Sequence, residues 1–203
     1  MRGRFITFEG IDGSGKTTQL AAAAAALRAA GVDVLETREP GGTALGEALR
    51  ALLLQHPMSP LTETLLMFAA RVEHIDEVIV PALGTGHWVL CDRFTDATYA
   101  YQSGGRGIAP EWIASLEGWA HPTLQPDLTV VVDLDPQQAA IRRARVRSAD
   151  RFEAEDVAFF ERVRAVYLER ARSDPRRFLV VDGARPGAEA VERIMARVKP
   201  WRA

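Results

Sequence analysis

The stretch Gly10-Ile11-Asp12-Gly13-Ser14-Gly15-Lys16-Thr17 follows the pattern G-x-x-x-x-G-K-T and stands between a strand-like run, residues 5–9, and a helix-like segment. Glycines at such positions let the chain turn its backbone N–H groups inward around phosphate oxygens. Lys16 can then reach the β- and γ-phosphates, and the Thr17 hydroxyl can ligate Mg²⁺. The pattern and its setting predict that residues 10–17 bind a nucleoside triphosphate, with a glycine turn and an incidental lysine as the alternative.

Apolar runs of strand length alternate with longer helical patterns along the chain, which is typical of βαβ units and a parallel sheet. The expected strands span residues 4–9, 33–37, 88–91, 128–133 and 178–181. The expected helices span residues 17–30, 45–54, 61–83, 95–103, 110–120, 137–147, 157–174 and 188–198. The sequence therefore predicts an α/β fold with a five-stranded parallel sheet that has helices on both faces.

The composition limits the possible partners. The 203 residues, 47% of them hydrophobic, suffice for one core, so we expect a single domain over residues 1–203. A formal net charge of −2 gives no general attraction to nucleic acid. The apolar run at residues 20–27 is far shorter than the roughly 20 residues that span a bilayer, and the first strand leaves no room for a signal peptide. With its one cysteine, Cys91, in a strand-like run, the protein is expected to be cytoplasmic, with no membrane or nucleic-acid partner.

Two expected strands end in an acid that could supply a second Mg²⁺ ligand, Asp92 and Asp133. Only Asp92 is followed directly by an arginine, Arg93, which could neutralise charge on a transferred phosphoryl group. We therefore assign the metal role to Asp92 and expect Asp133 and Asp135 to be structural or to cap the helix that starts near residue 136. Because ligands of parallel sheets gather at the carboxyl ends of the strands, Arg38 and Glu39 are expected at the same edge.

Missing motifs narrow the class of triphosphate-binding protein. A guanine-reading N-K-x-D loop needs an asparagine, and the chain contains none. The stretch Ser103-Gly104-Gly105-Arg106 is only superficially like an ABC-type signature, and a chain of this size leaves little room for a mechanical module. A transferase that acts on a small acceptor is the class that these absences favour.

With these motifs the chain resembles bacterial thymidylate kinases, which are P-loop nucleoside monophosphate kinases, nearly from end to end. The segments that carry the resemblance are Phe8-Glu9-Gly10-Ile11-Asp12-Gly13-Ser14-Gly15-Lys16-Thr17-Thr18, Arg38-Glu39-Pro40-Gly41-Gly42-Thr43, Asp92-Arg93-Phe94, Ala100-Tyr101-Gln102 and Gly104-Gly105-Arg106-Gly107. The resemblance implies a P-loop kinase fold and Mg²⁺-dependent transfer of the ATP γ-phosphoryl group to dTMP, giving dTDP and ADP. It also implies a homodimer, because the family commonly associates through helices.

The resemblance also assigns a closing lid and the catalytic cations. Lys16 and Arg93 are the expected catalytic residues. An arginine-rich lid is expected at about residues 142–153, and because positions 11–14 carry no cation, the lid must supply one, from Arg147 or Arg151. Arg142 and Arg143 are expected to solvate a helix face.

The acceptor site follows from the same resemblance. Arg38 and Arg50 would form a clamp on the acceptor phosphate, since two guanidinium forks match phosphate oxygens. Arg71 would bond O4 of thymine, and the stacking partner of the base would be Phe68, with Met67 as the alternative and a core role for both left open. The remaining expected contacts are with the sugar, the metal region or the pyrimidine edge, from Asp12, Glu39, Thr98, Tyr101 and Gln102.

Two rival functions stay open at this stage. One is a kinase for another acceptor, such as dUMP or a deoxynucleoside. The other is a regulatory nucleotide-binding subunit without turnover, against which the intact Lys16, Thr17 and Asp92 argue.

Overall fold

The computed structural model describes residues 2–144 and 151–202, and its centre is a five-stranded sheet in the order β2-β3-β1-β4-β5. Every neighbouring pair of strands runs parallel, as predicted from the sequence. The strands are β1 (Phe5–Glu9), β2 (Val34–Arg38), β3 (Trp88–Asp92), β4 (Leu128–Asp133) and β5 (Phe178–Asp182).

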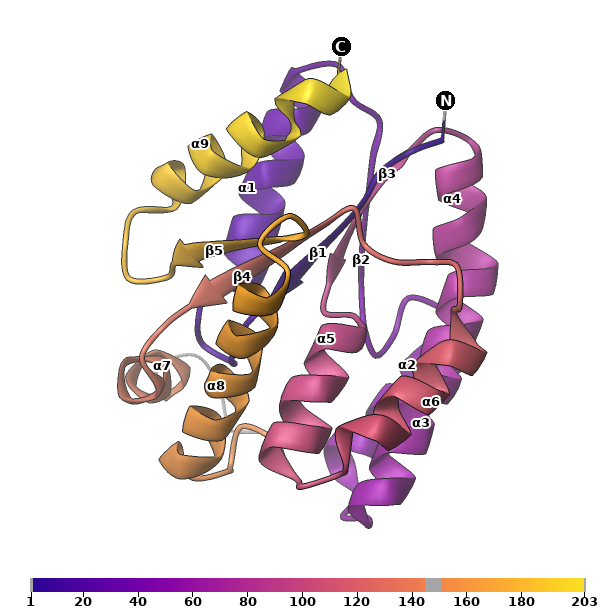
Figure 1. Ribbon diagram of the computed structural model, residues 1–203, viewed down its shortest axis with the longest axis vertical. Helices are drawn as coiled ribbons and strands as arrows, with labels where there is room; N and C mark the ends of the chain where they lie inside the picture. The colour runs from indigo at the N-terminus through magenta and orange to yellow at the C-terminus, as the bar shows by residue number, and fades with distance from the viewer. Residues whose placement is uncertain (1, 145–150, 203) are drawn as a thin grey trace.

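Helices cover both faces of this sheet, which confirms the predicted α/β arrangement (Figure 1). The α-helices are α1 (Lys16–Ala29), α2 (Ala44–Gln55), α3 (Pro60–His74), α4 (Val80–Gly84), α5 (Thr95–Thr98), α6 (Pro110–Ala120), α7 (Pro136–Arg143), α8 (Val157–Ser173) and α9 (Gly187–Val198). None of the helices within the described ranges is both long and apolar enough to cross a membrane.

Two π-helical segments interrupt what the sequence predicts as continuous helices. The segment η1 (Ile75–Ile79) joins α3 to α4, and η2 (Tyr99–Gly105) continues α5. A 3₁₀ turn, η3 (Lys199–Arg202), follows α9. Such π segments are frequent at functional sites, and η2 carries two of the predicted substrate contacts, Tyr101 and Gln102.

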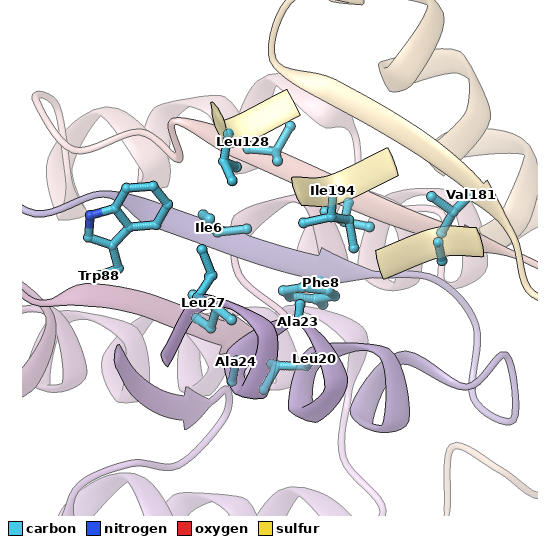
Figure 2. Close-up of a cluster of buried hydrophobic side chains, with 14 of the residues drawn as sticks. Ile6, Phe8, Leu20, Ala23, Ala24, Leu27, Trp88, Leu128, Val181 and Ile194 are labelled. Carbon is cyan, nitrogen blue, oxygen red and sulfur yellow. The ribbon is translucent and has the colours of Figure 1, made fainter. Parts of the chain in front are cut away.

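The first face of the sheet packs on α1 and α9. Alternate residues of β1, Ile6 and Phe8, point to this face and meet Leu27 of α1 and Ile194 of α9, as Figure 2 shows. The alanine run of α1 lets that helix lie close to the strands, because its small side chains Ala23 and Ala24 are fully buried there. This packing fixes the helix that follows the glycine-rich loop.

The opposite face packs on α8 and on the segment formed by α5 and η2 (Figure 1). Cys91 of β3 is fully buried on this face, as its strand position predicts. Helices α2, α3 and α6 form a further group beyond β2 and β3, in which α3 contacts both of the others. The space between this group and η2 contains part of the candidate site.

Asp133 and Asp135 have the structural roles expected of them. Asp135 caps α7, since its Oδ1 accepts from the backbone N–H groups of Gln137 at 3.0 Å and Gln138 at 3.2 Å. Asp133 forms a two-pronged ion pair with Arg164 of α8, with N···O distances of 2.6 and 2.9 Å. The carboxylate of Asp133 is therefore already engaged by α8, as a structural role requires.

Candidate active site

The loop between β1 and α1 has backbone torsions that its glycines allow. Gly10 has φ 133° and Gly13 has φ 83°. A Cβ on Gly10 would lie 2.4 Å from the carbonyl oxygen of Val132, so the close approach of β4 also requires glycine there. Ile11 is buried in the core and Ser14 is also buried, and the backbone N–H of Ser14 donates to the carbonyl of Ile11 at 3.1 Å, which closes the turn of the loop.

The parallel register brings Asp92 to this loop. Phe8 of β1 pairs with Asp92, and Arg38 of β2 pairs with it from the other side. The Thr17 hydroxyl donates a 2.7 Å hydrogen bond to Oδ2 of Asp92. The two predicted metal ligands are thus in contact, and the structure brings together a hydroxyl and a carboxylate of the kind that Mg²⁺ accepts.

The described residues contain no cluster of three or more histidine, cysteine, aspartate or glutamate side chains that could hold a metal ion by themselves. A Mg²⁺ site built from one carboxylate and one hydroxyl fits this chemistry, because Mg²⁺ commonly keeps waters and takes its other ligands from substrate phosphates. The donor set of Thr17 and Asp92 therefore suits a metal that arrives with a nucleotide.

Arg93 is the most connected side chain of the site. Its Nη1 donates to the carbonyl oxygen of Gly10 and to the hydroxyl of Tyr167, both at 3.1 Å. Its Nη2 donates to Oδ1 of Asp12 at 2.6 Å and to the hydroxyl of Tyr101 at 2.9 Å. The backbone of Arg93 has φ 75°, a strained value for a residue with a side chain. These contacts hold the guanidinium group between the glycine-rich loop, η2 and α8.

Asp12 and Lys16 share this electrostatic environment. Burial by itself would raise the pKa of Asp12, but the nearby Arg93 and Lys16 outweigh it and lower that pKa below the usual range. Burial and the neighbouring Arg93 lower the pKa of Lys16, whose Nζ lies 3.5 Å from Oδ1 of Asp12 and donates to the carbonyl of Ile11 at 3.3 Å. Asp12 thus partly compensates two cations that are close together.

Two cavities adjoin Arg93, and four residues line both of them. The loop cavity is lined by Asp12, Gly13, Gly15, Lys16, Thr17, Thr18, Arg38, Glu39, Arg50, Asp92, Arg93, Arg142, Arg143 and Glu153. The inner cavity is lined by Asp12, Glu39, Pro40, Arg50, Leu54, Met67, Arg71, Arg93, Phe94, Ala97, Thr98, Tyr101, Gln102 and Phe152. The shared residues are Asp12, Glu39, Arg50 and Arg93.

Arg71 lines the inner cavity with a side chain whose orientation is fixed. Its side chain is buried, with Nε donating to Oε2 of Glu39 at 2.7 Å and Nη2 donating to Thr98 Oγ1 at 3.1 Å. Its Nη1 is buried and has no hydrogen-bond partner among the described residues. Glu39 is held from its other side by Nδ1 of His74, at 3.0 Å. A buried donor of this kind matches an acceptor atom of a bound ligand.

Arg38 and Arg50, predicted as a phosphate clamp, both line the loop cavity, and Arg50 lines the inner cavity as well. Arg38 pairs with Glu47 of α2 at 2.8 Å, and Nη1 of Arg50 donates to the carbonyl of Pro40 at 3.0 Å. Arg50 therefore lies at the junction of the two cavities, whereas Arg38 lines the loop cavity alone.

The expectation that Phe68 stacks on a base does not agree with this geometry. Phe68 is buried in a cluster with Tyr99 and Ile113 and does not line the inner cavity, whereas Met67 does. The reason is tertiary packing, since positions three and four residues before Arg71 both neighbour it on α3, and Phe68 is the one that packs against Tyr99 and Ile113. Phe68 instead lies beneath the guanidinium of Arg71, with 4.8 Å from Cζ to the ring centroid.

The predicted lid arginines are only partly described. Arg147 lies outside the described residues. Arg151 lies against α2 and α3, where Nε donates to the carbonyl of Leu53 at 3.0 Å and Nη2 lies 2.7 Å from Oε2 of Glu63, and it does not line the loop cavity. The expectation that Arg142 and Arg143 only solvate a helix face is wrong. Both line the loop cavity, and Arg143 Nη1 donates to the carbonyl of Asp12 at 2.7 Å.

Sequence reasoning missed a buried pair behind Arg93. Glu9, fully buried at the end of β1, accepts from the backbone N–H of Phe94 at 2.7 Å and from the hydroxyl of Tyr167 at 2.8 Å. Burial first, and then the negative charge of Asp96, raises the pKa of Glu9 to about 8. Glu9 belongs to the segment at residues 8–18 that carries the family resemblance, but its sequence position indicates no role for it. No local signal connects Glu9 to Tyr167, which is 158 residues away along the chain.

The cavity beside the glycine-rich loop shares four lining residues with a second, arginine-containing cavity, an arrangement typical of a P-loop phosphotransferase. A family model described as thymidylate kinase matches residues 8–194. The chain belongs to the thymidylate kinase family.

Individual relatives agree with this placement. The thymidylate kinase of Bordetella pertussis is 60% identical over 185 residues, which are 91% of this chain and 89% of the relative. That of Methylobacillus flagellatus is 55% identical over 186 residues, 92% of each chain. The crystal structure of thymidylate kinase from Ehrlichia chaffeensis superposes with a TM-score of 0.81 at 34% identity, covering 98% of this chain and 100% of the other.

The raised pKa of Glu9 predicts a pH-dependent loss of stability. The unfolded chain ionises this carboxyl near its ordinary pKa of 4.5, while the folded protein does so only near 8. The folded state therefore holds the extra proton between these values, and its free energy of unfolding falls as the pH rises through that window. We expect wild type to lose on the order of a few kcal/mol relative to Glu9→Gln over this range. Urea unfolding of both proteins at several pH values measures the difference, and parallel profiles would contradict it.

Proposed function

We propose that this enzyme transfers the γ-phosphoryl group of ATP to dTMP, giving dTDP and ADP, with Mg²⁺ bound at Thr17 and Asp92. The observation that carries the proposal is the meeting of the loop cavity and the inner cavity at Asp12, Glu39, Arg50 and Arg93. A triphosphate in the first cavity and a monophosphate in the second would face each other across these residues. In-line phosphoryl transfer needs this arrangement of donor and acceptor.

On the donor side, the backbone of residues 10–17 would surround the phosphates. Lys16 would contact the β- and γ-phosphates, and the positive end of α1 would face the same anion. Thr17 and Asp92 would hold Mg²⁺, which would supply positive charge to the triphosphate. Arg143 and Arg142, which line the same cavity, are placed to add positive charge there.

On the acceptor side, the inner cavity would hold the pyrimidine deoxynucleotide. Arg38 and Arg50 would hold the acceptor phosphate at the junction, and the unpaired Nη1 of Arg71 would donate to O4 of the base. Met67 would lie against the flat face of the base in place of an aromatic ring. The contacts that remain, with the sugar and the pyrimidine edge, fall to Asp12, Glu39, Thr98, Tyr101 and Gln102.

The chemistry follows from charge and position. The acceptor phosphate is already an anion, so the reaction needs no strong general base. Arg93 lies where both cavities meet and would bridge donor and acceptor phosphates as charge spreads over the transferred group. Lys16 would contribute from the donor side, and Arg147 or Arg151 would add a lid cation upon closure, which would also exclude water. We propose that all these groups belong to one kinase domain over residues 1–203, with the lid at about residues 142–153.

The substrate assignment is tested by ADP release with Mg-ATP and a panel of nucleoside monophosphates. We expect dTMP to give the highest kcat/KM, with dUMP, dCMP and dGMP below it. If dCMP or dGMP gave as much product as dTMP, the acceptor assignment would be wrong, and absence of turnover with every acceptor would favour a regulatory role.

Lys16→Ala should remain folded and lose about a hundredfold in kcat, or on the order of 3 kcal/mol of transition-state stabilisation.

We also propose that two copies of the chain associate through α2, α3 and α6. Helix α3 packs against both α2 and α6, and seven of the ten exposed large apolar side chains among the described residues lie on these three helices. The exposed residues are Leu45 and Leu52 of α2, Leu61, Leu65 and Val72 of α3, and Trp112 and Trp119 of α6. Trp119 is 87% exposed, and a second copy of the chain on this surface would bury its indole ring.

If two copies associate through this surface, a charged substitution within it should produce a monomer. Leu65→Glu, at a position 47% exposed, should convert the dimer to a monomer in light scattering after size-exclusion chromatography, because a carboxylate would be desolvated in the interface. Ile141→Glu, at a position 57% exposed on α7, is the matched control and should leave the dimer intact. A monomeric wild type, or a dimeric Leu65→Glu protein, would refute this surface.

A further inference from the structure

A buried carboxylate on α3 contacts the side chain that would read the pyrimidine edge. Glu63 is fully buried, and Gln102 of η2 is 1% exposed. The Nε2 group of Gln102 donates to Oε1 of Glu63 at 2.8 Å. Gln102 lines the inner cavity, whereas Glu63 does not. Glu63 can therefore act on a ligand in that cavity only through Gln102.

The contact fixes which end of the Gln102 amide faces the cavity. An ionised carboxylate accepts hydrogen bonds and cannot donate them, so the amide NH₂ group must point to Glu63. The usual ambiguity between the oxygen and nitrogen of a glutamine side chain is thereby removed. The amide oxygen, an acceptor, is the atom left for a ligand.

Cations on the other side keep Glu63 in place. Oε2 of Glu63 lies 2.7 Å from Nη2 of Arg151, and Oε1 lies 3.5 Å from Nε of Arg106. Arg106 in turn pairs with Glu155 at 2.5 Å. Because a buried carboxylate that lost these partners would be strongly destabilised, its position and its acceptor-only character are fixed together.

This orientation distinguishes pyrimidines by their hydrogen-bond pattern. Thymine and uracil present an N3–H donor beside the O4 acceptor, while cytosine presents an N3 acceptor beside an amino donor. The cavity offers the complementary pair, an acceptor from Gln102 and a donor from Arg71. A cytosine in the same pose would oppose acceptor to acceptor and donor to donor.

We propose that Glu63 is a positioning residue for base specificity: it holds the Gln102 amide so that the enzyme accepts bases with an N3–H group and rejects cytosine. The inference rests on the proposed function, since it needs a pyrimidine nucleotide in the inner cavity. It assigns Glu63 no contact with substrate. Its effect is on the choice between substrates.

The test compares kcat/KM for dTMP, dUMP and dCMP in Glu63→Gln and Glu63→Met. Glutamine keeps the size but offers both a donor and an acceptor, and methionine offers no comparable acceptor, so neither variant dictates the direction of the Gln102 amide. The dUMP to dCMP ratio should fall about tenfold, the fold-change for one net hydrogen bond. The dTMP to dUMP ratio, which reports the 5-methyl contact alone, should stay within about twofold of wild type.

Ratios from one protein sample do not depend on the fraction that is folded, so partial destabilisation cannot imitate the effect. Glu155→Gln is the matched control, because it removes another carboxylate from Arg106 without touching Gln102, and both ratios should match wild type. In a Gln102→Ala background, Glu63→Gln should cause no further change.

An unchanged dUMP to dCMP ratio in both Glu63 variants would overturn the inference, as would an equal fall of both ratios. A wild type that does not prefer dTMP would instead refute the proposed function.

Discussion

The site depends on one side chain, the guanidinium group of Arg93, and on the four oxygen atoms that hold it. These oxygens come from Gly10, Asp12, Tyr101 and Tyr167, and so from the glycine-rich loop, η2 and α8. Five N–H donors in a fixed plane allow one arginine to join several elements, which a lysine could not do. The strained φ of 75° at Arg93 persists because the surrounding contacts determine where the side chain must lie. Arg93 also lines both cavities, so the residue that joins these elements lies on the proposed path of the phosphoryl group.

Buried and half-buried acids orient the recognition groups of the site. Asp12 holds Arg93, Glu39 holds Arg71, and Glu63 holds Gln102 together with Arg151. Each acid lowers the cost of burying a cation or fixes the direction of an amide before any substrate arrives. Charges that are already oriented need little reorganisation during phosphoryl transfer, which is the main source of electrostatic catalysis. The proposed contacts of Arg93, Arg71 and Gln102 with substrate therefore depend on the acids that orient these side chains.

The sequence predicts the parts of this site that are local. The sheet follows from apolar runs, and contact between Thr17 and Asp92 follows from parallel strands that end at one edge. It could not predict contacts between distant segments. Tyr167 reaches Glu9 only because α8 packs across the sheet, and the side of α7 that carries Arg143 depends on how that helix meets the loop. Helical spacing could not decide between Met67 and Phe68, since positions four and three residues before Arg71 both neighbour it on α3. The choice follows from tertiary packing, which encloses Phe68 with Tyr99 and Ile113 and leaves Met67 at the inner cavity.

The central claim, that Arg93 links the two substrates during transfer, is tested most directly by the turnover of Arg93→Lys. Lysine keeps the charge but loses the planar fork that contacts several oxygens at once. The count of active sites by ATP binding, together with the thermal midpoint, corrects for any unfolded fraction. The account predicts that kcat per ATP-binding site falls about a hundredfold while ATP still binds. A kcat close to that of wild type would contradict it, because the fork would then be dispensable for phosphoryl transfer.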